Sequence, residues 1–285
     1  MDLYNSFISI CKEKFYKAQM LRRLLENAVL KSKPLNLNGT LHVEYEPIPN
    51  SIQALNRLRY EGIAVKFVTN SDKLSNRTLL NRLLAAGFTI QQKEIHSSLS
   101  AGVKYVCKNN LNPYYLVSKD ARMDFPENDE KRPFDSVMIG LAPEEYSYEN
   151  LNKAFNILLT NKNAKLIAMQ KGKYYKRKND LTLGPGLYVK GVEYVVGAKA
   201  IILGKPNAYF FRSAIDDDVN VNECVMIGDD IRDDIMGAMK VGFKAIQVKT
   251  GKYLPDIVAV PSPTILVENF CEAVDWILEN RYKKI

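Results

Sequence analysis

The chain is poor in the residues that mark secreted, zinc-binding or membrane-spanning proteins. Its 285 residues include only four cysteines and two histidines. The cysteines are Cys11, Cys107, Cys224 and Cys271. They lack the spacings of a zinc site or a disulfide framework, so we expect reduced thiols in a cytoplasmic protein. No apolar run reaches the roughly 20 residues of a membrane-spanning helix, so we expect no membrane partner.

The chain also lacks long blocks of charge of one sign. Its 40 basic and 32 acidic residues leave a net charge of +8 but are interspersed. The exception is residues 171–178, where five basic side chains surround Tyr174 and Tyr175. Three interpretations remain open: a solvated hairpin tip, a surface that attracts a phosphorylated ligand, or a nucleic-acid contact. Nucleic acid is the weakest, because no nucleic-acid-binding motif accompanies the patch.

What the chain does contain is a dense acidic cluster directly after an apolar segment. The cluster comprises Asp229, Asp230, Asp233 and Asp234. Residues 223–227 have the composition of a buried strand, and Gly228 permits a sharp turn after it. Four carboxylates in one loop and first helical turn repel each other unless a cation compensates for them. Oxygen ligands of this kind favour Mg2+.

Helix capping is the alternative interpretation of these acids. A helix N-terminus stabilises negative charge through its dipole, and this explanation fits Asp233 better than Asp229. Asp229 lies nearest to the end of the predicted strand, where ligands bind in open parallel sheets.

Outside its middle, the chain alternates between strand and helix patterns. Helices are predicted at 51–60, 73–86 and 99–107, and strands at 63–68, 95–98, 200–203 and 223–227. This alternation predicts a doubly wound parallel α/β sheet built from residues 34–111 and 198–285. Residues 112–197 break the pattern and predict an inserted, smaller α/β domain. The apolar periodicity of residues 1–33 predicts a helical extension that docks on the core rather than a targeting helix.

Polar residues end four of the predicted strands. The four strand ends lie at residues 35–40, 68–70, 203–206 and 227–230. Because such ends converge on one crevice in a doubly wound sheet, Thr69 and Asn70 are candidates to hold phosphate oxygens, Lys205 to neutralise charge and Asp229 to bind metal. Taken singly, Thr69 and Asn70 are as typical of a turn, and Lys205 of a surface lysine. Their combination and order are more specific.

These motifs resemble the haloacid dehalogenase superfamily, and within it the C2-capped phosphatases of the NagD type. The resemblance covers residues 34–285. It is carried by Gly-Thr-Leu-His at 39–42, Phe-Val-Thr-Asn at 67–70, Gly-Leu-Ala-Pro-Glu at 140–144, Tyr-Tyr-Lys-Arg-Lys at 174–178, Leu-Gly-Pro-Gly at 183–186, Gly-Lys-Pro at 204–206 and Val-Lys-Thr-Gly-Lys-Tyr at 248–253.

The resemblance implies a Rossmann-like core with a C2-type cap inserted between the second and third motifs. Such enzymes use Mg2+ and an aspartate nucleophile to hydrolyse small phosphorylated molecules through an aspartyl-phosphate, and they often form homodimers through the cap. The matching positions are Asn36 for the nucleophile, Asn38 for the acid/base, Thr69, Asn70 and Lys205 for phosphate, Tyr175, Lys176 and Arg177 for the substrate, and Asp229, Asp230 or Asp234, Asn36 and the Asn38 carbonyl for the metal.

The first motif departs from the family pattern at its nucleophile. Asn36 stands where the family has the aspartate that attacks phosphorus and binds Mg2+, and its neutral carboxamide can do neither in the same way. Mg2+ affinity is expected to fall with the lost charge. Asn38 matters less as a metal ligand, because any residue there offers its backbone carbonyl.

The segment before the first motif is also unusual, since Lys31, Lys33 and Pro34 bring charge and a proline into a strand that should be apolar. Three functions therefore stay open. The first is a pseudophosphatase that binds a phosphorylated ligand, the second is an active Mg2+-dependent phosphatase with another nucleophile, and the third is a nucleic-acid-binding or scaffold protein.

Overall fold

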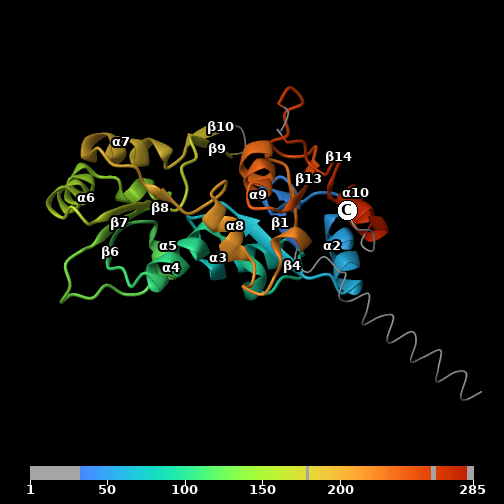
Figure 1. The fold of residues 1–285 in the computed structure, drawn as a ribbon, viewed down its shortest axis with the longest axis horizontal. Helices are drawn as coiled ribbons and strands as arrows, with labels where there is room; N and C mark the ends of the chain where they lie inside the picture. The colour runs from blue at the N-terminus through green and yellow to red at the C-terminus, as the bar shows by residue number, and fades with distance from the viewer. Residues whose placement is uncertain (1–32, 178–179, 258–260, 281–285) are drawn as a thin grey trace, which may run out of the picture.

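A computed structural model describes residues 33–177, 180–257 and 261–280. The helix expected over residues 1–33 lies almost wholly outside this range. Two parallel sheets lie side by side, each with its own helices (Figure 1). Among the described residues, no helix is long and apolar enough to cross a membrane. The chain is thus a mixed α/β protein with a parallel central sheet, as the sequence predicts.

The larger sheet has six parallel strands in the order β14-β13-β12-β1-β4-β5. These strands are β1 (Lys33–Asn36), β4 (Val65–Thr69), β5 (Ile95–Ser97), β12 (Val225–Gly228), β13 (Lys244–Val248) and β14 (Ile265–Val267). The central strand β1 pairs with β4 and β12, with Asn36 opposite Val68 and Leu35 opposite Ile227. This register brings the ends of three motif-bearing strands next to each other.

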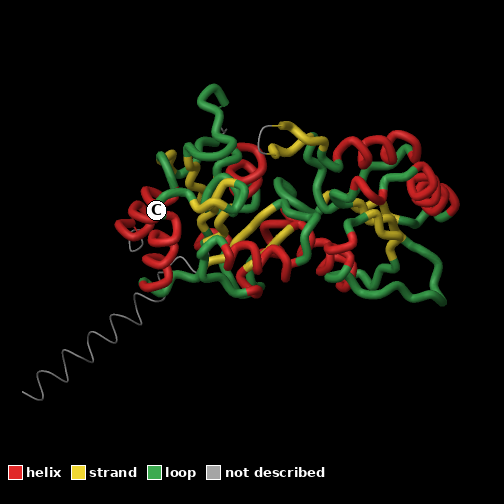
Figure 2. The backbone as a smooth tube through the Cα atoms, turned by 180° about the vertical axis from the view of Figure 1, so that it is seen from behind, coloured by secondary structure: helices red, strands yellow, loops and turns green. Residues whose placement is uncertain are grey.

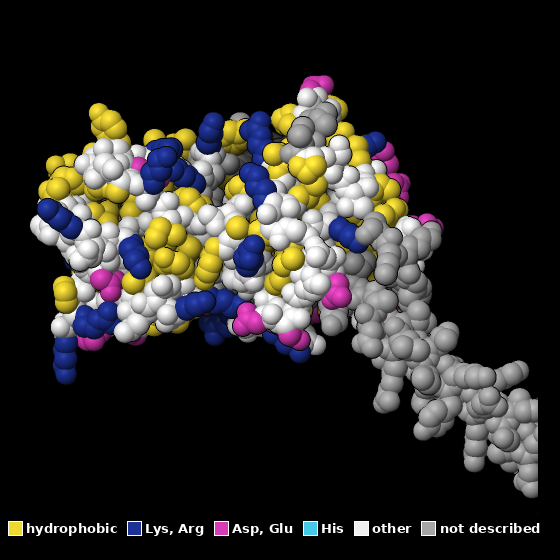
Figure 3. Space-filling view, in the orientation of Figure 1, with side chains coloured by type: hydrophobic (Ala, Val, Ile, Leu, Met, Phe, Trp, Pro, Cys, Tyr) yellow, Lys and Arg dark blue, Asp and Glu magenta, His cyan; other side chains and the backbone are white. Residues whose placement is uncertain are grey.

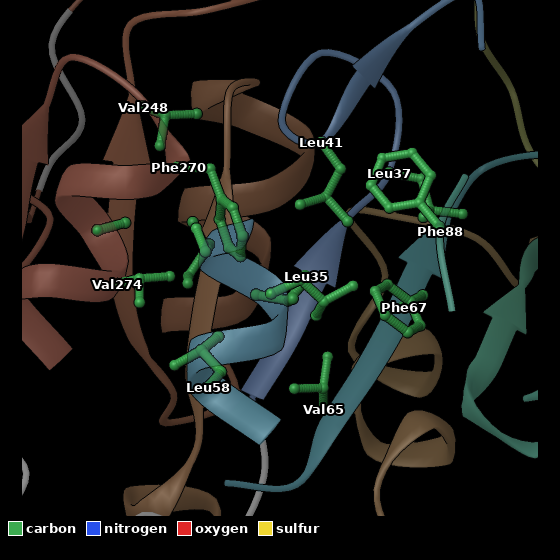
Figure 4. Packing of buried hydrophobic residues seen from close by; sticks show 14 of the residues in the cluster. Leu35, Leu37, Leu41, Leu58, Val65, Phe67, Phe88, Val248, Phe270 and Val274 are labelled. Atoms are coloured by element: carbon green, nitrogen blue, oxygen red, sulfur yellow. The ribbon is translucent and has the colours of Figure 1, made fainter. Parts of the chain in front are cut away.

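Helices cover both faces of this core sheet. One face carries α2 (Ser51–Tyr60), α3 (Asn76–Ala85) and α10 (Phe270–Asn280), and the other carries α4 (Ser98–Lys108), α8 (Ala208–Ala214) and α9 (Gly237–Met239). Adjacent residues of a strand point to opposite faces. Phe67 therefore belongs to the apolar cluster that contains Leu35 and Phe270 (Figure 4), while Val68 belongs to the cluster that contains apolar residues of α4 and α8. Both faces are apolar, as expected of a buried parallel sheet.

Pro34 sits inside the central strand rather than disrupting it. Its position opposite Lys66 of β4 is part of a continuous four-residue register, and both Pro34 and the following Leu35 are buried. Proline offers no amide hydrogen to the sheet, but the strand on either side of it remains aligned. Residue 36 is therefore held at the end of an intact β1.

The smaller sheet has four parallel strands in the order β11-β8-β7-β6. They are β6 (Pro113–Leu116), β7 (Ser136–Ile139), β8 (Lys165–Ala168) and β11 (Ile201–Ile202). The associated helices are α5 (Lys119–Arg122), α6 (Tyr148–Thr160) and α7 (Gly186–Val196). Seen from behind in Figure 2, these helices and strands form a second α/β unit beside the first. We refer to this unit as the cap.

Two antiparallel hairpins and several short helical turns complete the described chain. The hairpins are β2 (His42–Val43) with β3 (Glu46–Pro47), and β9 (Tyr174–Arg177) with β10 (Asp180–Leu183). The turns are η1 (Gln92–Glu94), η2 (Pro143–Glu145), η3 (Val221–Glu223) and the π-helical η4 (Ile231–Met236). In both views the β9–β10 hairpin projects between the cap and the core.

The expectation that residues 200–203 join the core sheet is wrong. Ile201 and Ile202 pair with Ile167 and Ala168 of β8, so β11 is an edge strand of the cap sheet, while β12 lies in the core sheet. A two-residue apolar run has no feature that identifies which of two parallel sheets it joins. The chain returns to the core only after β11, and Lys205 then reaches the carboxyl ends of the core strands, where it contacts Asn36.

The cap is tied to the core by a buried carboxyl group. Asp72, in the loop after β4, is only 2% exposed and accepts hydrogen bonds from the Leu141 amide (3.0 Å) and the Gln170 side chain (3.3 Å), both in the cap. Burial raises the pKa of Asp72 to about 7, against the opposing effect of these two hydrogen bonds.

This raised pKa predicts how stability changes with pH. A carboxyl group whose pKa is higher in the folded state contributes stability below its unfolded pKa, near 4, and loses it as pH rises through about 7. We expect Asp72→Asn to remove that loss, so its stability relative to the wild type should increase from pH 5 to pH 8 by about 1 kcal/mol or more. Urea unfolding at both pH values measures this, and parallel pH dependences would contradict it.

Candidate active site

The predicted site residues of the core come together at the carboxyl ends of the parallel strands. Asn36 ends β1, Thr69 ends the neighbouring β4, and Asp229 follows β12 on the other side. Lys205 reaches the same strand ends from the loop after β11 and contacts Asn36 there. Ends of adjacent parallel strands share one edge of the sheet, which is where ligands bind in this class of fold.

Lys205 lies at the centre of the cluster. Its ammonium donates to Asn36 Oδ1 at 2.9 Å and to Asp234 Oδ1 at 2.5 Å, and its side chain is only 4% exposed. The alternative that Lys205 is a surface lysine is therefore wrong. Such a buried cation is held by partners that accept hydrogen bonds and carry compensating charge.

The Asn36 side chain makes three hydrogen bonds. Its Oδ1 accepts from Lys205, while its Nδ2 donates to Asp229 Oδ1 at 2.7 Å and to the Asn38 carbonyl at 2.8 Å. The residue is 7% exposed. Every hydrogen-bonding group of the carboxamide that faces the site is thereby engaged.

Asp229 is almost fully enclosed by donors from other segments. Besides Asn36, the Thr40 hydroxyl donates to its Oδ1 (3.2 Å) and the Lys252 backbone amide to its Oδ2 (2.8 Å). Burial and the nearby Asp234 raise the pKa of Asp229 to about 6, although these hydrogen bonds oppose the shift. The charge of Lys205 also opposes the shift, but burial outweighs it, so the carboxylate is costly to charge in this place.

Asp230 and Asp233 have different surroundings from Asp229. Asp230 caps the turn η4, accepting from the amides of Arg232 and Asp233, both at 3.0 Å. These amides and the Lys252 ammonium lower the pKa of Asp230, although burial alone would raise it. Burial and the neighbouring Asp230 raise the pKa of Asp233 to about 6. The capping interpretation, which from the sequence fits Asp233 better than Asp229, applies to Asp230 in the structure, and the metal role that the resemblance implies for Asp230 or Asp234 stays a prediction.

Two glycines make room for Asp229. Gly39 has a φ of +86°, and a Cβ added there would overlap the Asp229 carboxylate; Gly251 approaches the same carboxylate. We expect Gly39→Ala to destabilise the protein by about 1–3 kcal/mol more than Gly62→Ala. Gly62 has a similar φ of +70° but open space around it, so it controls for backbone strain. Chemical denaturation of the two variants compares the costs, and equal losses would contradict the close packing.

Asn70 and Thr69 differ in how far their side chains are engaged within the protein. The Asn70 side chain accepts from the Lys205 backbone amide at 2.8 Å and donates to the Lys205 carbonyl at 3.1 Å. It thereby fixes the loop that presents the Lys205 ammonium. Thr69 Oγ1 accepts from the Ser71 amide at 3.3 Å, which leaves its hydroxyl hydrogen available for another acceptor.

The substrate-recognition residues expected in the cap lie on the β9–β10 hairpin. Tyr175 is partly buried on β9, and the side chains of Lys176 and Arg177 lie outside the described part of the chain. Lys171, at the start of the basic patch, is paired with Glu193 of α7 at 2.6 Å. Over the face drawn in Figure 3, Lys and Arg side chains are scattered rather than gathered into one stripe.

Sequence reasoning assigned no role to two residues that contact the acidic cluster. Thr40 and Lys252 both donate to Asp229, and the Lys252 ammonium lies 3.4 Å from Asp230 Oδ2. Both residues lie within motifs that resemble the family, at 39–42 and 248–253, and this resemblance could have pointed to them. Asn38, the expected acid/base, is exposed, and its side-chain oxygen accepts from the Glu44 amide at 3.3 Å.

The donor set does not match a Mg2+ site in this arrangement. No group of three or more acidic, histidine or cysteine side chains within the described residues is placed to hold a metal ion. Asp229 Oδ1 and the Asn38 carbonyl both accept from Asn36 Nδ2, and Asn36 Oδ1 and Asp234 Oδ1 both accept from Lys205 Nζ, so these oxygens already face nitrogen donors. An amide nitrogen has no lone pair to offer a metal.

Two family models match the chain. "Haloacid dehalogenase-like hydrolase" matches residues 35–129, and a second model of HAD-type hydrolases matches residues 202–273. Haloacid dehalogenase-like hydrolase domain-containing protein 2 of Rattus norvegicus is 44% identical over 255 residues, covering 88% of this chain and 97% of the relative. Human phospholysine phosphohistidine inorganic pyrophosphate phosphatase is 37% identical over 239 residues, covering 83% and 88%.

Solved structures share the fold at lower identity. A 4-nitrophenylphosphatase from Thermotoga maritima superimposes with a TM-score of 0.79 at 21% identity, covering 88% of this chain and 98% of its own. The glycerol phosphate phosphatase Rv1692 from Mycobacterium tuberculosis, solved in complex with calcium, gives 0.73 at 19% identity, covering 85% and 74%.

Proposed function

Because the chain belongs to the haloacid dehalogenase-like hydrolases, in the phosphatase branch, we propose that it binds a phosphorylated small molecule without hydrolysing it through an aspartyl-phosphate. One observation carries this proposal. The side chain at the nucleophile position, Asn36, contacts Lys205 at 2.9 Å and Asp229 at 2.7 Å. These contacts support the assignment of residue 36 to the nucleophile's position, where it would present a carboxamide to the substrate.

The chemistry of the carboxamide supports the absence of turnover. A carboxylate attacks phosphorus through a charged oxygen, and the resulting acyl phosphate is then hydrolysed. The Asn36 oxygen is neutral and already accepts a hydrogen bond from Lys205, while its nitrogen lone pair is delocalised. Asn38 also offers an amide where the family places a proton donor and acceptor. The protein therefore lacks the usual carboxylate for the attack on phosphorus at residue 36 and the usual proton donor and acceptor at residue 38.

Recognition of phosphate is supported by the groups that remain. The Lys205 ammonium lies beside Asn36 at the end of β1, the Thr69 hydroxyl hydrogen is available at the neighbouring strand end, and the basic β9–β10 hairpin projects between cap and core. We propose Tyr175, Lys176 and Arg177 as the residues that select the organic part of the ligand. A homodimer through the cap and a cytoplasmic location belong to the same proposal, by family resemblance.

Turnover and binding assays together test the proposal. Wild-type protein with p-nitrophenyl phosphate and added Mg2+ should release no more p-nitrophenol than Asp229→Ala does. A 31P NMR titration with the same ester should detect binding, which should weaken in the double variant Lys176→Ala/Arg177→Ala. Absence of binding would refute ligand recognition.

An active phosphatase with a different nucleophile is the competing function, favoured by the convergence of Lys205, Asp229 and Asp234. It predicts robust wild-type turnover that survives Asn36→Ala and disappears in Asp229→Ala. That result would replace our proposal.

A further inference from the structure

The four acids around Asn36 are held together by protein donors. Asp229 accepts from Asn36, Thr40 and Lys252, as described above. Asp234 accepts from the Lys205 ammonium at 2.5 Å and from the Asp230 amide at 3.2 Å. Asp230 accepts from two backbone amides, and the Asn70 amide lies 3.5 Å from Asp233. The acidic cluster is therefore satisfied by protein donors, among them the Lys205 ammonium, without requiring a metal ion.

We propose that the Asn36 carboxamide takes the place of the divalent cation in this site, and that the site is consequently complete without metal and closed to Mg2+. The Nδ2 group joins two oxygens, Asp229 Oδ1 and the Asn38 carbonyl, which follow two different strands of the core sheet. Each oxygen receives one of its two hydrogens. In this respect the amide performs the bridging task of an ion that binds both oxygens.

The orientation of the carboxamide follows from its neighbours. Lysine has three donors and no acceptor, so the atom of Asn36 that faces Lys205 Nζ must be the oxygen. The nitrogen must then face Asp229 and the Asn38 carbonyl, which both accept. The hydrogen-bond network thus permits only one of the two amide orientations.

This orientation works against metal binding. To offer its oxygen to an ion beside Asp229, Asn36 would have to turn its amide over. Its NH2 group would then face the Lys205 ammonium, so that two donors oppose each other in a buried place. An aspartate would meet both demands at once, with one oxygen on Lys205 and the other on the ion. The asparagine excludes the ion by geometry as well as by lost charge.

This inference goes beyond the proposed function, because it concerns the folded protein without substrate. A protein could fail to turn over phosphate and yet bind Mg2+ through Asp229. Metal-dependent stability separates these cases without any measurement of activity.

Thermal unfolding in EDTA and in millimolar Mg2+ tests the proposal on the wild type and two variants. The wild-type melting temperature should be the same in both conditions. Asn36→Asp should melt at a lower temperature in EDTA, because its new carboxylate faces Asp229. Mg2+ should then raise its melting temperature by about 5 °C or more at about 100 times the dissociation constant.

Asn112→Asp is the matched control. Asn112 is 3% exposed in the cap, and its NH2 group donates to the carbonyls of Asp129 and Arg132 at 3.1 and 2.9 Å. This variant should also melt at a lower temperature, but without recovery in Mg2+. An equal Mg2+-induced rise in the wild type and Asn36→Asp would overturn the proposal, as would indifference of Asn36→Asp to Mg2+.

Should Asn36→Asp fail to fold, Mn2+ binding to the wild type decides the question. The electron paramagnetic resonance signal of free Mn2+ should stay undiminished at millimolar protein. A loss of that signal that Asp229→Asn restores would overturn the proposal.

Discussion

Asn36→Asp is expected to gain phosphatase activity that depends on Mg2+. The strand β1 is intact in register with β4 through residue 36, and Lys205 is already within 2.9 Å of the side chain. The carboxylate of Asn36→Asp would therefore lie where the amide lies now. A displacement of a reacting group by about 1 Å can lower the rate by roughly 10^2, and we expect no such displacement here.

The expected gain is large because the nucleophile itself is restored. Removal of a nucleophile from a serine protease lowers kcat by about 10^6, and we expect Asn36→Asp to exceed the wild type by at least about 10^3. Turnover of p-nitrophenyl phosphate with and without Mg2+ measures this. Asn38→Asp alone, which supplies an acid/base but no nucleophile, is the control and should remain as inactive as the wild type. Equal turnover of wild type and Asn36→Asp would contradict the assignment of residue 36.

Lys205→Met is expected to destabilise the fold strongly. The ammonium is the cation paired with Asp234, and the two side chains are 4% and 0% exposed. Removing one partner of a buried ion pair leaves an uncompensated charge, which costs about 3–5 kcal/mol. The substitution would also remove the hydrogen bond from Lys205 to Asn36, the residue that in turn donates to Asp229.

Urea unfolding of Lys205→Met beside Lys249→Met measures this cost. Lys249 pairs with Glu268 at 2.5 Å, but the two side chains are 35% and 62% exposed. Such exposed pairs contribute up to about 1 kcal/mol. Similar small losses in the two variants would show that Lys205 does not hold the cluster together.

The regular elements of the core follow from local sequence patterns. Apolar spacing predicts a helix at 51–60, and α2 spans Ser51–Tyr60. The apolar run before Gly228 predicts the strand that is β12. These elements are predictable because burial on one or both faces imposes a period that a short window of sequence contains.

Sheet membership and hydrogen-bond direction do not follow from such windows. Ile201 and Ile202 have the composition of a core strand, yet they extend the cap sheet, because that choice depends on the distant β8. Asp230 and Asp229 are adjacent in sequence, yet one caps a helical turn and the other is buried beside Asn36. The substitution at residue 36 is visible in the sequence, whereas the direction in which its amide points requires the position of Lys205.

The side-chain amide resonance of Asn36 in a 1H–15N spectrum, identified by its absence in Asn36→Asp, tests the central claim most directly. If the NH2 group holds Asp229 and the Asn38 carbonyl in place of a cation, its two protons should exchange slowly with water and keep their chemical shifts as Mg2+ is added to millimolar concentration. Fast exchange of those protons, or a saturable shift with Mg2+ that Asp229→Asn abolishes, would show that the amide is free and that the ion takes its place.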